Sequence, residues 1–153
     1  MIEGRHFQNA YVTRDVAAAM MRLKANMDVR LESAIQVPIE VWTPAGSGTM
    51  DCRLGFLWVE DLQIELIEPL SGPVDLYRDA LPAGEGLAFH HACMRVEDWA
   101  GFRARVDRQP LPVVLEGGSG PLRFLYLDAR ATIGHHLEYI SMPDAVWAGM
   151  GGR

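Results

Sequence analysis

Two stretches of this sequence repeat one pattern: Gln8-Asn9-Ala10-Tyr11-Val12-Thr13-Arg14-Asp15 and His91-Ala92-Cys93-Met94-Arg95-Val96-Glu97-Asp98. Both have strand length, the second with a clear alternation of polar and apolar residues, and both end on an aspartate, which commonly caps the start of a helix. Residues that favour helices follow each aspartate. The repeat therefore predicts a strand leading into a helix twice in the chain.

Two further pairs of segments match in the same order. Phe56–Glu60 corresponds to Phe124–Asp128, and Ile64–Ile67 corresponds to Leu137–Ile140. Because the order of matches is preserved, we interpret the chain as a duplication of a βαβββ module. Each module alone leaves one sheet face uncovered, so the two modules are expected to pack as pseudo-symmetric halves.

The pattern places all the expected elements in a single domain, residues 1–153. Module 1 covers about 6–69, a Pro- and Gly-rich connector covers 70–86, module 2 covers about 87–141, and a Gly-rich tail with Trp147 as its anchor covers 142–153. The predicted strands are 6–13, 38–42, 50–59, 62–67, 88–96, 110–116, 122–128 and 136–140, and the predicted helices are 16–27, 75–81 and 98–108.

Composition excludes several classes of protein. The chain has 153 residues with 14 Lys and Arg against 20 Asp and Glu, a net charge of −6, and no basic run, which argues against a nucleic-acid partner. No apolar stretch is long enough to span a membrane, and no export signal is recognised, so two reduced cysteines and a cytoplasmic location are expected. Ile2–Arg5 fits two interpretations equally well, a protease-recognition scar from an expression vector or native sequence.

Polar residues collect on one face of the predicted strands. Side chains two residues apart share a face, so Leu62, Ile64 and Leu66 leave Gln63 and Glu65 on the other side. By the same alternation His136 and Glu138 lie opposite Leu137 and Tyr139, and His91, Cys93 and Arg95 lie opposite Ala92, Met94 and Val96. The repeat aligns Gln8 with His91. If the sheets curl around one cleft, the four side chains that converge are Gln8, Glu65, His91 and Glu138.

Such a donor set suits a divalent metal ion. Buried carboxylates need a partner, and mixed oxygen and nitrogen ligands without thiolate favour Zn, Ni, Co, Mn or Fe(II). His6 is on the same strand face as Gln8 and is the alternative ligand. Taken singly, each residue is more often structural, and Cys93 is expected to be a small core residue. Arg95 is expected either to bind an anionic substrate or to form an ion pair.

At this point the residues resemble the vicinal oxygen chelate superfamily, which includes glyoxalase I, methylmalonyl-CoA epimerase, extradiol dioxygenases and bleomycin and fosfomycin resistance proteins. Tyr11–Asp15 with the following Ala-rich helix is similar to the family's opening strand and helix, and Ile64–Pro69 is similar to its module-ending strand. His90-His91 with Val96–Asp98 resembles the second opening, and Tyr126–Glu138 the last hairpin. The resemblance covers about residues 6 to 141.

The resemblance implies an α+β fold of two βαβββ modules in a pseudo-twofold arrangement, with a curled mixed sheet enclosing a cleft. It implies metal ligands at Gln8, Glu65, His91 and Glu138, and a small-molecule substrate that chelates the metal through vicinal oxygens. Glu138 is expected to act as general base, with Glu65 as a second base. Gln63, His136 and Arg95 are expected to contact the substrate, and family analogy implies a homodimer.

Three activities fit this reading. The first is a metal-dependent lyase or isomerase. The second is a metal-free drug-binding protein of the bleomycin-resistance type, with Trp42, Trp58 and Trp99 as candidate contact residues. The third is a small Fe(II) ring-cleaving dioxygenase, against which Gln8 weighs because iron sites of that class use two His and one Glu.

Overall fold

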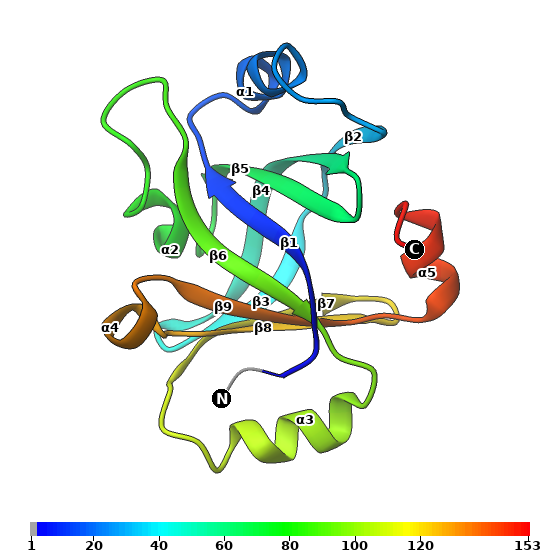
Figure 1. The fold of residues 1–153 in the computed structure, drawn as a ribbon. Coiled ribbons are helices and arrows are strands. Elements are labelled where there is room, and N and C mark those ends of the chain that lie inside the picture. Colours follow the sequence, from blue (N-terminus) through cyan, green and yellow to red (C-terminus); the bar gives the residue numbers. More distant parts are fainter. Residues whose placement is uncertain (1–2) are drawn as a thin grey trace.

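Strands β1 (Arg5–Val12) and β6 (Ala88–Arg95) run side by side in antiparallel register and join the two halves of the molecule (Figure 1). The computed structural model describes residues 3–153, so the scar-like stretch Ile2–Arg5 begins outside the described residues. None of the helices described is both long and apolar enough to cross a bilayer. In the first half the elements are β1 Arg5–Val12, α1 Val16–Lys24, β2 Leu31–Gln36, β3 Ile39–Thr43, β4 Gly46–Val59 and β5 Leu62–Ser71. The connector holds α2 Asp75–Arg78, and the elements after it are β6 Ala88–Arg95, α3 Trp99–Val106, β7 Val113–Ser119, β8 Leu122–Leu127, α4 Arg130–Ile133, β9 His136–Ser141 and α5 Asp144–Gly149.

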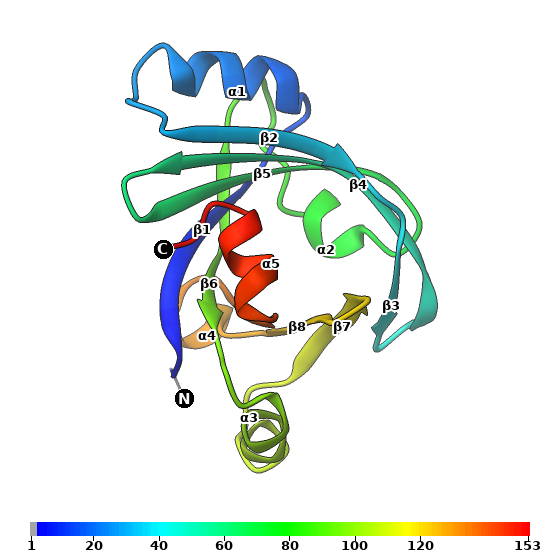
Figure 2. The same cartoon turned by 90° about the vertical axis from the view of Figure 1, so that its right-hand side faces the viewer.

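The strands form one mixed sheet that closes on itself. The pairs β1–β5 and β6–β9 are parallel, and the other pairs are antiparallel. The sheet runs in the order β2-β4-β3-β7-β8-β9-β6-β1-β5, and an additional β4–β5 pairing closes it into a barrel-like shape (Figure 2). The predicted α+β fold with a curled mixed sheet is therefore confirmed.

The two halves also meet where β3 pairs with β7. This junction has only two residue pairs, Val41 with Gly117 and Trp42 with Glu116. A Cβ atom on Gly117 would lie 2.8 Å from both Val41 Cγ1 and Phe124 Cζ, which is closer than real contacts allow. The strands can therefore approach this closely because residue 117 has no side chain.

The second strand of the first module is longer than predicted. The sequence predicts a strand over 38–42, whereas the structure has β2 and β3 on either side of Val37-Pro38, both paired with the long strand β4. Gln36 pairs with Arg53 and Ile39 pairs with Met50, so the two pieces act as one strand interrupted at a proline, which cannot donate to the ladder. Every residue of β2 is exposed, and this weakens the hydrophobic alternation by which strands are recognised.

Helices α1 and α3 cover the outer faces of the two halves (Figure 1). As predicted, Asp15 and Asp98 cap them, accepting hydrogen bonds from the backbone N–H groups of Ala18 and Gly101. The helices end at Lys24 and Val106, a few residues earlier than the sequence predicts. The apolar strand faces expected from alternation pack beneath them, with Ile64 and Leu66 under α1 and Met94, Leu137 and Tyr139 under α3.

The tail carries a short helix, α5, that the sequence analysis did not predict and that lies across an open end of the curled sheet (Figure 2). Its buried Trp147 packs edge-on against Phe7 with ring centroids 4.8 Å apart and against Trp58 at 5.7 Å. The Trp58 indole N–H donates to the carbonyl of Met150 at 2.7 Å. Trp147 therefore anchors the tail, as expected from the sequence.

Replacing Trp147 by alanine should destabilise the fold by about 3–5 kcal/mol, because it removes a buried aromatic side chain and leaves a cavity against Phe7 and Trp58. Urea unfolding followed by circular dichroism measures this change. Met21→Ala is the control, since Met21 is 71% exposed and its removal should change the unfolding free energy by less than about 0.5 kcal/mol. Equal urea midpoints for the two variants would show that the tail does not support the barrel.

Candidate functional site

Two rows of side chains cross the four central strands β5, β1, β6 and β9. One row is Gln63, Gln8, Cys93 and Glu138, and the other is Glu65, Ala10, His91 and His136. The repeat relates Gln8 to His91, Glu65 to Glu138 and Gln63 to His136. In each of these pairs one residue belongs to the first row and its repeat equivalent belongs to the second. The duplicated backbone therefore presents the same positions twice but with different chemistry.

Glu65, His91 and Glu138 meet on the inner side of these strands. One ligand atom from each lies within 4.8 Å of the others. Nε2 of His91 is 3.0 Å from Oε2 of Glu138 and 3.5 Å from Oε2 of Glu65. All three residues are buried, and His91 has no exposed surface. The structure thus brings together three of the four predicted ligands, from strands β5, β6 and β9.

A neighbouring histidine fixes the tautomer of His91. Nε2 of His90 lies 3.1 Å from the carbonyl oxygen of Leu76 in α2, so that nitrogen must carry a proton and donate it. Burial, reinforced by the charge of His91, holds the pKa of His90 well below its usual range, so His90 is neutral and its Nδ1 can only accept. The 2.9 Å contact between the two Nδ1 atoms is therefore donated by His91, which leaves Nε2 of His91 facing the carboxylates.

The cluster is strongly coupled in its charges. Burial raises the pKa of Glu65, the charge of Glu138 adds to this, and contact with His91 opposes it. Burial alone would lower the pKa of His91, but the close contacts and charges of Glu138 and Glu65 outweigh it and raise the pKa to about 9. Without a metal ion, His91 therefore holds a proton at neutral pH between the two carboxylates.

These residues fit a divalent metal ion. The contacts of His91 Nε2 miss hydrogen-bond geometry, so this buried nitrogen is unsatisfied within residues 3–153 although two carboxylate oxygens lie beside it. An imidazole nitrogen and two carboxylates are ligands that Zn, Mn, Co, Ni and Fe(II) accept. Gln8 is buried and donates from Nε2 to Gln63 Oε1 at 2.8 Å, so its amide nitrogen is already engaged and its amide oxygen is the atom that could act as a ligand.

The other predicted site residues lie in different surroundings. His6, the alternative to Gln8, is exposed, and its Nε2 contacts Asn9 Oδ1 at 2.9 Å. Arg95 is ion-paired with Asp144 at 2.5 Å and stacks over Trp147, outside the residues that line the cavity described below. His136 is buried next to His91 but does not line the cavity. Its Nδ1 lies 3.9 Å from Asp128 Oδ1 and has no hydrogen-bond partner among residues 3–153, and burial lowers its pKa to about 4.

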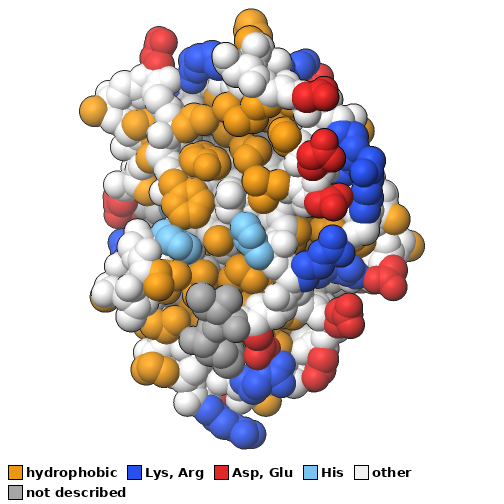
Figure 3. Space-filling model, in the orientation of Figure 1, with side chains coloured by type: hydrophobic (Ala, Val, Ile, Leu, Met, Phe, Trp, Pro, Cys, Tyr) orange, Lys and Arg blue, Asp and Glu red, His pale blue; other side chains and the backbone are white. Residues whose placement is uncertain are grey.

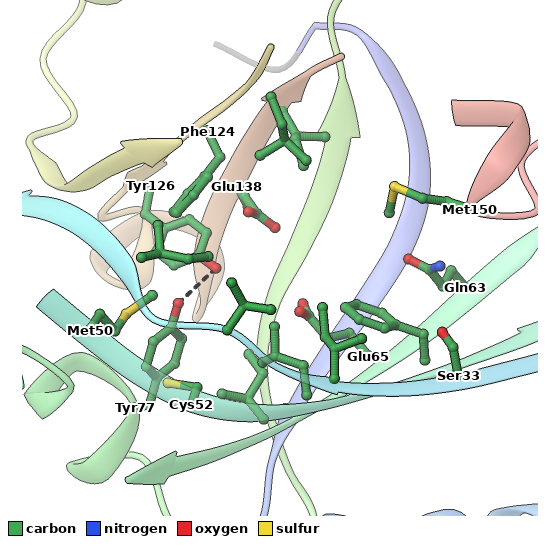
Figure 4. A pocket seen from close by; sticks show the side chains of 18 of the residues that line it. Ser33, Met50, Cys52, Gln63, Glu65, Tyr77, Phe124, Tyr126, Glu138 and Met150 are labelled. Carbon is green, nitrogen blue, oxygen red and sulfur yellow. Dashed lines mark hydrogen bonds between the residues drawn. The ribbon is translucent and has the colours of Figure 1, made fainter. Parts of the chain in front are cut away.

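A cavity of about 340 Å³ opens above the cluster. Figure 4 shows the carboxylates of Glu65 and Glu138 pointing into it from opposite sides, with Gln63 beside Glu65. Its other walls come from β2, β3, β4, β8 and the end of α5 and are mainly apolar. The apolar wall residues are Ile35, Val37, Ile39, Met50, Cys52, Leu54, Phe56, Ile67, Leu122, Phe124, Ile140 and Met150.

Sequence reasoning missed two tyrosines in this cavity. The hydroxyl of Tyr77 in α2 donates to that of Tyr126 in β8 at 2.9 Å (Figure 4). Burial, with the nearby Glu138 charge, raises the pKa of both tyrosines well above the usual range, so both stay neutral. Alternation along β8 places Tyr126 on the same face as Phe124, which was a usable signal, whereas nothing in the connector sequence pointed to Tyr77.

Two other groups of residues are accounted for by packing. Burial raises the pKa of the Cys93 thiol well above its usual range and that of Cys52 to about 12, so both are neutral thiols. Trp58 is buried against Phe7 and Trp147 and does not line the cavity. It is therefore not available as a contact surface for a bound drug.

Comparison with known proteins gives one family. The family model of the Glyoxalase/Bleomycin resistance protein/Dioxygenase superfamily matches residues 7–125. A search of curated protein sequences finds no match.

Several solved structures share the fold. A variant of methylmalonyl-CoA epimerase from Streptomyces coelicolor in complex with 2-nitronate-propionyl-CoA has a TM-score of 0.63 at 15% identity, covering 90% of this chain and 96% of that one. Methylmalonyl-CoA epimerase from Mycobacterium tuberculosis has a TM-score of 0.62 at 16% identity, covering 95% and 96%. A hypothetical protein from Bacillus halodurans C-125 has a TM-score of 0.62 at 15% identity, covering 91% and 94%. At these identities the likeness concerns the fold alone.

The metal-free protein should lose stability as the pH rises from about 6.5 to 9. The folded pKa of His91 is raised from 6.5 to about 9, so its contribution is complete below pH 6.5 and disappears as the pH passes 9. The loss should be roughly 2–3 kcal/mol in chelator-treated protein, measured by urea unfolding at each pH. His91→Gln should flatten this decline, and an unchanged decline in that variant would assign the titration to another group.

His90→Leu should weaken zinc binding by about 10- to 100-fold, because it removes the acceptor that orients His91 and holds its proton on Nδ1. Competition with a chromophoric chelator measures the Kd, and far-ultraviolet circular dichroism checks the fold. His90→Gln keeps a side-chain acceptor and should restore part of the affinity. If the leucine variant binds zinc as tightly as the wild type, the His90 contact does not support the ligand.

Proposed function

The chain belongs to the Glyoxalase/Bleomycin resistance protein/Dioxygenase superfamily, and from this premise we propose that it is a divalent-metal-dependent isomerase or lyase. Its substrate would be a small molecule that presents two neighbouring oxygens to the metal. The proposed ligands are Gln8, Glu65, His91 and Glu138, and the proposed ion is Zn, Ni, Co, Mn or Fe.

The observation that carries this proposal is the buried Glu65–His91–Glu138 cluster at the bottom of an open cavity. Two buried carboxylates need positive charge beside them; the single proton of His91 balances one of them, and a divalent cation would balance both. A metal-free drug-binding protein has no need of such a cluster. A ring-cleaving iron site would need a second histidine ligand, and the cluster holds only one.

In the proposed reaction the residues of this chain move a proton and hold charge. A bound divalent ion would act as a Lewis acid toward a substrate oxygen. Glu138 would accept the proton from the carbon next to the carbonyl group and return it, with Glu65 as a second base on the opposite side of the cavity. Tyr126, whose hydroxyl already accepts from Tyr77, has its own proton available for a substrate oxygen.

Membership of this superfamily also supports proposals about substrate contacts, cellular location and oligomeric state. We propose Gln63, which lines the cavity, and His136, which is buried behind it, as substrate-contact residues. We keep Arg95 as a proposal, with its ion pair to Asp144 as the competing role. We also propose the single-domain division given above, a cytoplasmic location and a homodimer. Apolar side chains gather over β1 and β6 (Figure 3), where Phe89 is exposed and contacts Tyr11, and this face supports association of two copies.

The test combines metal analysis with proton exchange. Purified protein should contain about one divalent ion per chain, and in D2O it should exchange the proton next to the carbonyl of 2-oxo or 2-hydroxy carbonyl probes, followed by ¹H NMR. Glu138→Gln should slow exchange by about 10²- to 10⁴-fold, because it removes the base. Chelation should abolish exchange, and metal should restore it.

The control variant is Glu97→Gln, since Glu97 is exposed on the loop before α3 and does not line the cavity. It should exchange at the wild-type rate. Exchange that survives chelation, or that is equal in the Glu138 and Glu97 variants, would overturn the proposed activity.

A further inference from the structure

The last turn of α5 lies at the mouth of the cavity. Gly149 and Met150 are the residues of the tail that line it, and Figure 4 shows Met150 reaching over the cavity on the same side as Ser33 and Gln63. Helix α5 itself lies across an open end of the curled sheet (Figure 2). The tail therefore forms part of the cavity wall without pairing with any strand of the sheet.

This segment crosses from one half of the molecule to the other. Its start follows directly from β9 of the second half, whereas its far end is bound to the first half. The Trp58 indole N–H in β4 donates to the carbonyl of Met150 at 2.7 Å, and Nη2 of Arg30 donates to the carbonyl of Gly151 at 2.7 Å. We call residues 149–153 the strap.

The strap is held less firmly than the part of α5 before it. The hydrogen bond from Arg30 to the Gly151 carbonyl is exposed to solvent, as is the one from Arg5 to the carbonyl of Arg153 at 2.9 Å. Trp147, in contrast, is buried in the core. Because exposed hydrogen bonds protect little against local opening, the least costly opening begins after Trp147, which stays in place.

Glycines favour unwinding of the strap at a defined point. Gly151 is required by the closed form, since its φ is +92° and a Cβ atom there would lie 2.5 Å from Cδ2 of Leu31. Gly149 is not required in this way, because a Cβ atom on it would meet nothing within 4 Å. A helical glycine with free space around it gives up helix stability without relieving a clash. The last turn of α5 therefore contains a weak point at Gly149.

From this arrangement we propose that the strap is a gate of the cavity. In the conformation described here residues 149–153 narrow the mouth, and unwinding of the last turn of α5 beyond Trp147 widens it. Gly149 is the point at which the strap bends, and Arg30 is the residue that holds it closed. The proposal concerns access to the cavity, so it stands independently of the metal ion and of the proposed reaction.

The two cysteines report opening of the mouth and of the barrel separately. Cys52 lines the cavity and is 4% exposed, whereas Cys93 has no exposed surface and does not line the cavity. The experiment alkylates the metal-free full chain with N-ethylmaleimide and follows each cysteine by mass spectrometry. Local opening of the mouth exposes Cys52 alone, while unfolding exposes both thiols.

Two variants should shift the alkylation of Cys52 in opposite directions. Arg30→Gln removes an exposed hydrogen bond to the strap and should speed it by about three- to tenfold. Gly149→Ala stiffens the last turn without a clash and should slow it by about two- to fivefold. The rate at Cys93 should stay unchanged in both variants.

Arg108→Gln is the matched control, because Arg108 is exposed after α3, lies outside the cavity lining and loses the same charge. It should alkylate at the wild-type rate at both cysteines. Equal Cys52 rates in all four proteins would show that the reagent reaches the cavity without movement of the strap, and the gate would be refuted. A parallel rise at Cys93 in the Arg30 variant, or an equal rise in the Arg108 variant, would refute it as well.

Discussion

Three titratable side chains are buried close together in this structure, and the fold has to balance their charges. Glu65, His91 and Glu138 lie on three different strands, and each would be costly alone in the interior. Their mutual contacts, and the proton or cation held between them, make the burial tolerable. The parallel pairs β1–β5 and β6–β9 and the antiparallel junction β1–β6 are the geometry that brings these strands into adjacent positions.

The duplication explains why equivalent strand positions of both halves face the site. The residue types at these positions differ between the halves, and this difference sets the chemistry of the site. The repeat relates Gln8 to His91 and Gln63 to His136, so one half provides amides where the other provides imidazoles. On the imidazole side a relay reaches the backbone, through His90 and the carbonyl of Leu76 in the connector. The connector therefore does more than link the modules, because it fixes the tautomer of His91 and supplies Tyr77 to the cavity wall.

The parts of this arrangement that sequence could predict are those set by local periodicity. Alternation around Ile64 and Leu66, and around Leu137 and Tyr139, correctly separates the residues beneath the helices from those facing the cavity. The repeat then places Glu65 and Glu138 at equivalent points of a curled sheet, and the structure brings them together with His91.

The parts that sequence did not predict are set by contacts between distant segments. Strand β2 has no buried residue and exists because β4 is long enough to pair with it. Helix α5 is held by Trp147 against Phe7 from the other end of the chain, and Tyr77 of α2 meets Tyr126 of β8 at the cavity through a hydrogen bond. The barrel is also closed by a contact between distant segments, the pairing of β3 with β7. At the seam between β3 and β7 only two residue pairs meet, whereas the neighbouring ladder β7–β8 has six and β4–β5 has nine. Local separation of the strands is therefore expected to begin at this seam, where the fewest paired residues have to part.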